Sequence, residues 1–244
     1  MTPDWTDIER TPGANVGLGV TLSFVAGATN AGGFLAVGSY TSHMTGVVSG
    51  LADSMVLRHW PLVWLGLASL LAFFFGAMTT AWIVNWALRR QWRCAFGLPL
   101  LLEALLLLLF GLFGAVMGLH SLVAPVTVLL LCFIMGLQNA LVTKITNAEI
   151  RTTHVTGLVT DLGIEVGKLL YVNAAHIKGK PVRANRRKLG IHLRLIVSFF
   201  VGALAGAVGF KEVGYIVTLP LALALLLLVR KPLLHDLRVW RALA

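Results

Sequence analysis

The chain has 244 residues, of which 57% are hydrophobic and 12% are charged, and its mean hydropathy is +0.84. A soluble fold carries roughly 25% charged residues, so this composition excludes a soluble domain as well as a disordered or collagen-like chain. The two cysteines, Cys94 and Cys132, lie in or beside apolar segments and indicate no disulfide framework. The composition predicts an integral membrane protein built only from α-helices.

The net charge of +10 does not indicate a nucleic-acid partner, because the basic residues flank apolar stretches and do not form a domain. The first 15 residues are polar and carry three acids against one Arg, which is the wrong start for an export signal. We therefore expect residues 1–15 to form a short cytoplasmic tail.

Apolar windows that match a bilayer core of about 30 Å predict the membrane-spanning helices. In chain order they are 16–38, 61–88, 95–118, 122–143, 190–210 and 213–229. Two further stretches, 42–57 and 153–174, have a helical pattern but contain ionisable side chains. They are either full spans, which gives eight helices across the membrane, or re-entrant segments, which gives six.

The distribution of basic residues favours six spans. If 42–57 and 153–174 do not cross, only Arg58 and Lys211 of the 20 Lys and Arg residues fall on the outer side, which leaves 18 on the inner side. With eight spans this asymmetry is lost. The positive-inside rule therefore predicts six spans, two re-entrant half-helices and both termini in the cytoplasm.

Motifs of the first half recur in the same order in the second half, which indicates an internal repeat. The matching pairs are Phe24-x-x-Gly27-x-x-Asn30 with Phe133-x-x-Gly136-x-x-Asn139, SHMTGVVSGL (42–51) with THVTGLVTDL (153–162), FFFGA (73–77) with FFVGA (199–203), and Leu98-Pro99-Leu100 with Leu219-Pro220-Leu221.

The matches predict repeats over 16–118 and 122–230, a basic loop at 176–190 and a cytoplasmic C-terminal tail at 231–244. Each repeat has three spans and one re-entrant segment. Because three is odd, the second copy enters the membrane in the inverted orientation. Inverted repeats are typical of transporters and channels, whose site lies at the repeat interface.

The paired motifs around His43 and His154 are the strongest site candidates. Ser42 and Thr153 are good N-cap residues, and a half-helix that begins there directs free N–H groups and a positive dipole end inward, as anion sites do. The histidines add groups that can exchange protons near neutral pH. The predicted substrate-binding residues of the two motifs are His43, Thr45, Gly46, His154, Thr156 and Gly157. The alternative is that these residues only pack and hydrogen-bond between helices.

Other polar residues of the spans and loops are weighed in the same way. Asn30 and Asn139 either line the same cavity or fix the fold by hydrogen bonds. Arg151 either clamps an anion at the cytoplasmic mouth or is an ordinary loop arginine. Two histidines alone make a weak zinc site, so we expect no metal and no cofactor.

Two acids are candidates for proton coupling. Glu103 lies near the middle of a strongly apolar helix, where burial suits coupling, and the alternative is a neutral or paired carboxyl. Asp161 follows His154 at helical spacing, together with Glu165 and Lys168, so an internal ion pair is the simpler account.

SHMTG after a Gly-rich first span, with RTTHVTGLVTDLG in the second half, resembles the YoaK family of bacterial multi-spanning membrane proteins over about residues 16–230. The family carries a domain of unknown function, so the resemblance implies a bacterial plasma-membrane location and no mechanism. Family members often have Asn after the first SHMTG, where this chain has Val47, which puts one polar contact in doubt. The resemblance implies as motif positions His43, Thr45, Gly46, Arg151, Thr153, His154, Thr156, Gly157 and Asp161.

These patterns favour a transporter of a small solute, an anion or weak acid, with proton coupling as an option. The alternatives are a passive channel of the same fold, a non-transporting partner subunit and, last, a membrane-embedded enzyme. No HExxH or GxSxG motif supports an enzyme. The expected partners are the lipid bilayer, the solute and, as an option, further copies of the chain. The substrate, the coupling ion and the direction stay open.

Overall fold

The computed structural model describes residues 5–7, 10–117, 123–146, 150–173 and 180–243, and every regular element within them is a helix. The prediction of an all-helical fold is confirmed. With η for a 3-10 helix, the elements are α1 (Pro12–Val37), α2 (Met44–Val56), α3 (Trp60–Arg89), η1 (Arg93–Phe96), α4 (Gly97–Met117), α5 (Val123–Ile145), α6 (Val155–Leu170), α7 (Arg186–Val213), η2 (Gly214–Val217) and α8 (Thr218–Leu243).

Five helical stretches of the described chain are long and apolar enough to cross a membrane: Gly13–Val37, Trp60–Arg89, Arg93–Leu112, Pro125–Ile145 and Arg186–Val239. The last stretch contains both α7 and α8, so it covers two of the predicted spans. By contrast, α2 and α6 have 13 and 16 residues, short of the roughly 20 that a crossing needs. Long apolar helices and two short ones are therefore both present, as the sequence indicates.

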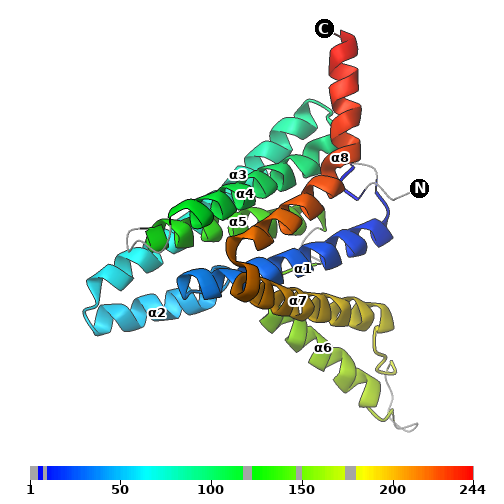
Figure 1. Cartoon of the computed structure of the whole chain (residues 1–244). Helices are drawn as coiled ribbons and strands as arrows, with labels where there is room; N and C mark the ends of the chain where they lie inside the picture. Colours follow the sequence, from blue (N-terminus) through cyan, green and yellow to red (C-terminus); the bar gives the residue numbers. More distant parts are fainter. Residues whose placement is uncertain (1–4, 8–9, 118–122, 147–149, 174–179, 244) are drawn as a thin grey trace.

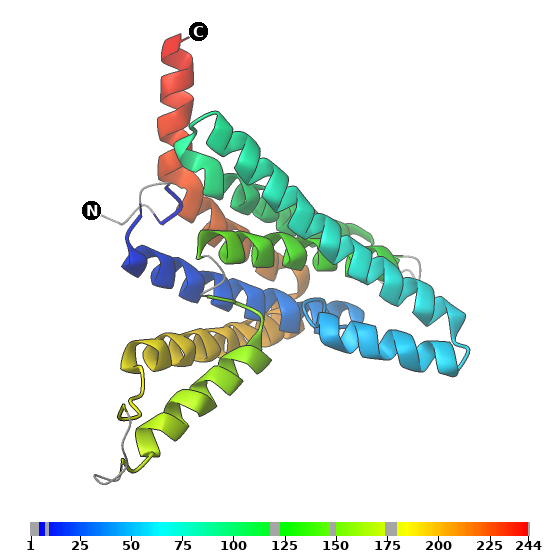
Figure 2. The same cartoon turned by 180° about the vertical axis from the view of Figure 1, so that it is seen from behind.

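The last helix extends beyond the predicted span. Hydropathy ends the span at 229, before Arg230 and Lys231, but α8 continues to Leu243 with Pro232 inside it. Polar residues such as Arg are still good helix formers, so the apolar pattern ends before the helix does. In Figures 1 and 2 this end of α8 projects from the bundle. Its Asp236 accepts hydrogen bonds from the backbone N–H groups of Arg93 and Cys94 at 3.2 and 2.8 Å, and so caps η1.

Helices of the first half pair with helices of the second half. α1 lies along α7, and α3 lies along α5. A Cβ atom added to Gly27 on α1 would lie 2.1 Å from the carbonyl oxygen of Phe199 on α7. A Cβ on Gly136 of α5 would lie 2.0 Å from the carbonyl oxygen of Phe73 on α3. The repeated Phe-x-x-Gly motifs are thus the points where helix backbones touch, as small residues permit in membrane bundles.

The FFxGA motifs form the other side of the same α1–α7 and α3–α5 contacts. A Cβ on Gly202 of α7 would lie 2.1 Å from the carbonyl oxygen of Phe24, and one on Gly76 of α3 would lie 2.1 Å from that of Phe133. Each motif of one half therefore packs on the other motif of the opposite half. The sequence repeats correspond to repeated helix contacts.

The short helices are packed in matching ways. α2 lies on α3 and α6 lies on α7, while α4 packs on α8. α2 and α6 begin near the middle of the molecule and run outward in different directions (Figures 1 and 2). Gly38, with φ of 70°, ends α1, and this left-handed conformation lets the chain turn back toward the start of α2.

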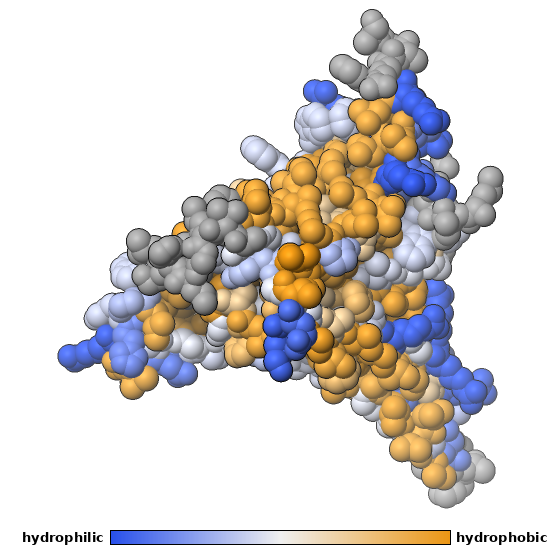
Figure 3. Space-filling view, viewed as in Figure 1, coloured by the Kyte–Doolittle hydropathy of each residue, from blue (hydrophilic) through white to orange (hydrophobic). Residues whose placement is uncertain are grey.

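The hydrophobic core lies between α1, α4, α5, α7 and α8, where it includes Leu22, Leu100, Leu131, Leu195 and Leu225. The outer surface is also largely apolar. On α3, for example, Trp64, Phe74 and Trp82 are exposed. In Figure 3 apolar residues cover most of the visible face, and hydrophilic residues gather mainly at its margins. Such a surface suits lipid, because a soluble protein rarely exposes apolar patches of this extent.

Candidate functional site

The two histidine motifs have the same local structure. His43 and His154 are the residues directly before α2 and α6, with φ and ψ of −94° and 66° and of −84° and 59°. Each ring folds over the glycine three residues later. A Cβ on Gly46 would lie 2.2 Å from Cδ2 of His43, and one on Gly157 would lie 2.4 Å from Nδ1 of His154. The glycines therefore make room for the rings.

Asn30 and Asn139 hold the starts of these helices in place. Oδ1 of Asn30 accepts hydrogen bonds from the backbone N–H of Ser42 at 3.1 Å and from its hydroxyl at 3.0 Å. Oδ1 of Asn139 accepts from the hydroxyl of Thr153 at 2.5 Å. Ser42 and Thr153 thus bond to the preceding long helix and do not cap their own helices, for which the sequence made them candidates.

Both motifs face one open cavity of about 500 Å³ between the two halves. Most of its lining comes in equivalent pairs: Asn30 and Asn139, Ser42 and Thr153, His43 and His154, Met44 and Val155, Thr45 and Thr156, Phe73 and Phe199, with Tyr40 in addition. We refer to it as the central cavity. It brings together six of the nine predicted substrate-binding residues.

The charge around the central cavity is favourable for an anion. Among the described residues, its lining contains no Asp or Glu. Neither His43 nor His154 caps its helix with a side-chain hydrogen bond, and neither helix has an acid in its first turn. The first N–H groups of a helix have no acceptor within it, and they carry partial positive charge. Two such helix ends converge on this cavity.

Three predicted residues, Arg151, Gly157 and Asp161, line a neighbouring hollow of about 400 Å³ between α6 and α7. We call it the α6–α7 hollow. His154 and Thr156 line both cavities. A guanidinium nitrogen of Arg151 lies 3.2 Å from Nδ1 of His154. Because a guanidinium can only donate, Nδ1 accepts this bond.

The acids predicted for proton coupling lie outside the central cavity. Asp161 pairs with Lys188 at 3.4 Å and lies 3.8 Å from Nε2 of His192. Glu103 on α4 is fully buried, and neither carboxyl oxygen has a hydrogen-bond partner among the described residues. The predicted ion pair of α6 is present, since Lys168 binds Glu165 at 2.9 Å.

Sequence reasoning missed Tyr40, Phe73, Phe199 and His192 as lining residues. The two phenylalanines begin the repeated FFxGA motifs, so the repeat itself could have indicated them. His192 lies on α7, outside every repeated motif, and only the packing of α6 on α7 brings it to Asp161.

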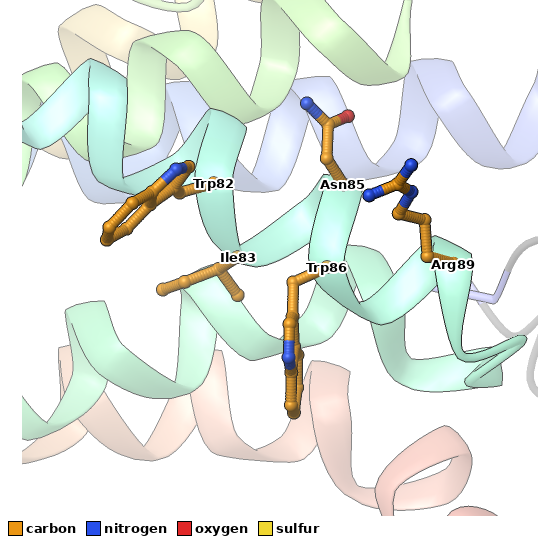
Figure 4. A pocket seen from close by; sticks show the side chains of 5 residues that line it. All are labelled: Trp82, Ile83, Asn85, Trp86 and Arg89. Atoms are coloured by element: carbon orange, nitrogen blue, oxygen red, sulfur yellow. The ribbon is translucent and has the colours of Figure 1, made fainter.

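A further hollow of about 510 Å³ lies on the outside of α3. Figure 4 shows Asn85 and Arg89 on one side of the helix, with Trp82 and Trp86 pointing elsewhere. Exposed tryptophans near basic residues are typical of a membrane–water interface. Because the described part of its lining comes from α3, this surface suits lipid better than an enclosed solute.

Among the described residues, no group of three or more His, Cys, Asp or Glu side chains is placed to hold a metal ion.

The family of unknown function DUF1275 matches residues 18–230. The chain belongs to this family. The match covers both repeats, and the YoaK resemblance is consistent with it. No curated protein and no solved structure matches the chain significantly. Its apolar helices make this DUF1275 member a multi-pass membrane protein.

Proposed function

We propose that the protein transports a small anion or weak acid through the central cavity, and that it is not an enzyme. The observation that carries the proposal is that α2 and α6 both begin at this cavity, each with a histidine and an uncapped N-terminus. Helix N-termini attract anions. The cavity volume of about 500 Å³ lies within the usual range for small-molecule sites.

The membrane layout belongs to the same proposal. The six spans are α1, α3, α4, α5, α7 and α8, and α2 and α6 are re-entrant half-helices. They form two inverted repeats, 16–118 and 122–230, in a bacterial plasma membrane with both termini in the cytoplasm. The reciprocal contacts of Gly27 and Gly136 support two equivalent halves. Half-helix N-termini that meet between inverted repeats are typical of secondary transporters.

Proton coupling is assigned to Glu103 and Asp161. A buried carboxyl without a hydrogen-bond partner, such as that of Glu103, is costly in its charged form. Intramembrane ionisable groups commonly belong to proton or substrate pathways. We expect Glu103→Gln to abolish accumulation driven by a pH gradient while exchange of labelled solute across the membrane continues.

The test is uptake of labelled acetate, sulfate and phosphate into vesicles that contain the purified protein. We expect saturable uptake of one of these anions and its loss in His43→Ala/His154→Ala. His59→Ala is the matched control, because His59 directly precedes α3 in the same way but lines neither cavity. Both variants should show the melting temperature of the wild type within a few degrees.

The outcomes separate the competing functions. Unchanged uptake in the double histidine variant contradicts the proposed site. Flux that neither saturates nor concentrates the anion indicates a passive channel. Absence of uptake, together with a protein that stably co-purifies, favours a non-transporting partner subunit.

A further inference from the structure

The second half carries charged groups where the first half has none. By the alignment of the repeated motifs, Arg151 corresponds to Tyr40, and Asp161 to Gly50. His192 on α7 corresponds to Gly66 on α3. The ring of Tyr40 stacks on Phe34 at a centroid distance of 4.4 Å. One half therefore places an aromatic stack beside its histidine motif, and the other places a polar hollow there.

The α6–α7 hollow has a buried polar group without a partner. His192 is 3% exposed and lines this hollow, and its Nδ1 has no hydrogen-bond partner among the described residues. Leaving a buried polar atom unpaired costs free energy. Nδ1 itself has almost no accessible surface, so a ligand in the hollow would remove this cost after a rotation of the imidazole that turns Nδ1 toward it.

The charges around the hollow favour a negative ligand. The carboxylate of Asp161 is half-exposed and is offset by Lys188 at 3.4 Å. Arg151 is exposed, and its only described polar partner is the neighbouring His154. Among the described residues, the guanidinium of Arg151 is therefore a cation without a carboxylate partner. It adds to the positive end of α6, which begins at Val155 with no side-chain cap.

We propose that the α6–α7 hollow is a second site for the same class of small anion, bound by Arg151, His192 and the first turn of α6. This inference rests on the proposed transport function. His154 and Thr156 line both cavities, so an anion passes His154 on its way to the central cavity. In the first half, Tyr40 and Gly66 stand at the positions of Arg151 and His192, so the anion is loaded in this way from one side only.

The test is calorimetric titration of the full-length protein in detergent with sodium sulfate and with sodium acetate at constant ionic strength. We expect two sites for one of these anions in the wild type. Arg151→Gln should weaken one of them about tenfold, since it removes a charged hydrogen-bond donor. Arg194→Gln removes another exposed arginine, from α7, and should leave both sites unchanged.

Two further variants show whether the Arg151-dependent site lies in the α6–α7 hollow or in the central cavity. His43→Ala alters only the central cavity, so the Arg151-dependent site should persist in it. His192→Leu removes the unpartnered nitrogen and should weaken the same site as Arg151→Gln. The proposal is overturned by a single site in the wild type, by no anion binding, or by an Arg151→Gln effect that disappears in the His43→Ala background.

Vesicle uptake separates this inference from the proposed function. If His43→Ala abolishes uptake while Arg151→Gln leaves both binding and uptake unchanged, the result supports the transport function and contradicts the second site. If the wild type shows no uptake but still binds sulfate or acetate in an Arg151-dependent way, the result supports the second site and contradicts the transport function.

Discussion

Two regions of this molecule carry the same motif but differ beside it. Beside the first histidine motif, Tyr40 stacks on Phe34, whereas beside the second, Arg151 contacts His154. The helix contacts have not diverged in this way. Gly27 and Gly136 both press on carbonyl oxygens of the opposite half. Contacts between halves involve both copies at once, so a change in one requires a matching change in the other. The contacts of Tyr40 with Phe34 and of Arg151 with His154 each lie within one half, so a change there requires no matching change in the other half.

The largest expected effect comes from filling the contacts that both halves share. In Gly27→Ala and Gly136→Ala, the new Cβ would meet backbone oxygens at 2.1 and 2.0 Å, and backbone cannot rotate away. We expect a loss of about 3 kcal/mol in the free energy of unfolding, at the upper end of overpacking effects. The loss should be similar in both variants, and thermal unfolding measures it.

Gly50→Ala is the control for this pair, because a Cβ there has no neighbour within 4 Å. It should be neutral or slightly stabilising, since Ala favours helix more than Gly. A stable Gly136→Ala beside an unstable Gly27→Ala would show that the two contacts are not equivalent.

The next effect concerns the asparagines that hold the starts of α2 and α6. Asn30→Ala leaves both the N–H and the hydroxyl of Ser42 without their acceptor, whereas Asn139→Ala removes one acceptor from Thr153. With the usual cost of unpaired groups, we expect losses of about 2 and about 1 kcal/mol. Amide hydrogen exchange at Ser42 should also become faster in Asn30→Ala. Equal losses, or a larger one in Asn139→Ala, would contradict this ranking.

A smaller stability effect is expected where the new atom meets a side chain. In Gly46→Ala and Gly157→Ala, the Cβ would displace the ring of His43 or His154, which can rotate about its side-chain bonds. The loss of stability should be about 1 kcal/mol, but uptake should fall strongly in both variants. Gly163→Ala, which has open space around its Cβ, should retain uptake. Normal uptake in both motif variants would show that the ring positions do not matter.

The smallest expected effect is a pH dependence of stability that arises from Glu165 in the second half. The Lys168 ammonium and the Asn185 backbone N–H bind Glu165 and lower the pKa of its carboxyl. A lowered pKa stabilises the fold above the ordinary pKa of Glu, and this stabilisation is lost as the pH falls through the lowered value. We expect the melting temperature of the wild type to fall more between pH 7 and about pH 2 than that of Glu165→Gln. Equal falls would exclude this contribution.

Sequence patterns predicted the all-helical fold and its long apolar helices, because hydropathy is a local property. The starts of the short helices α2 and α6 at His43 and His154 follow from the recurring motifs. Patterns also grouped six residues that share the central cavity. Neither spacing nor composition could separate Arg151 and Gly157 from that group, since their position depends on how α6 packs on α7.

Other misses have a related cause. His192 meets Asp161 only through the contact between two helices, and no motif surrounds it. The extension of α8 to Leu243 was missed because hydropathy detects the apolar span and not the polar helix that continues it. Asp236, which caps η1, lies on that extension.

The most direct test of the central claim asks whether the starts of α2 and α6 face the same cavity. Cysteines replace Thr45 and Thr156, which both line it, and a short bifunctional thiol reagent is added to the protein in membranes. The native cysteines Cys94 and Cys132 are buried. Ser49→Cys/Thr160→Cys, about one turn further along each half-helix, is the control. We expect rapid cross-linking of the 45/156 pair and little of the 49/160 pair. Absence of the 45/156 product, or equal cross-linking of both pairs, would contradict a shared cavity.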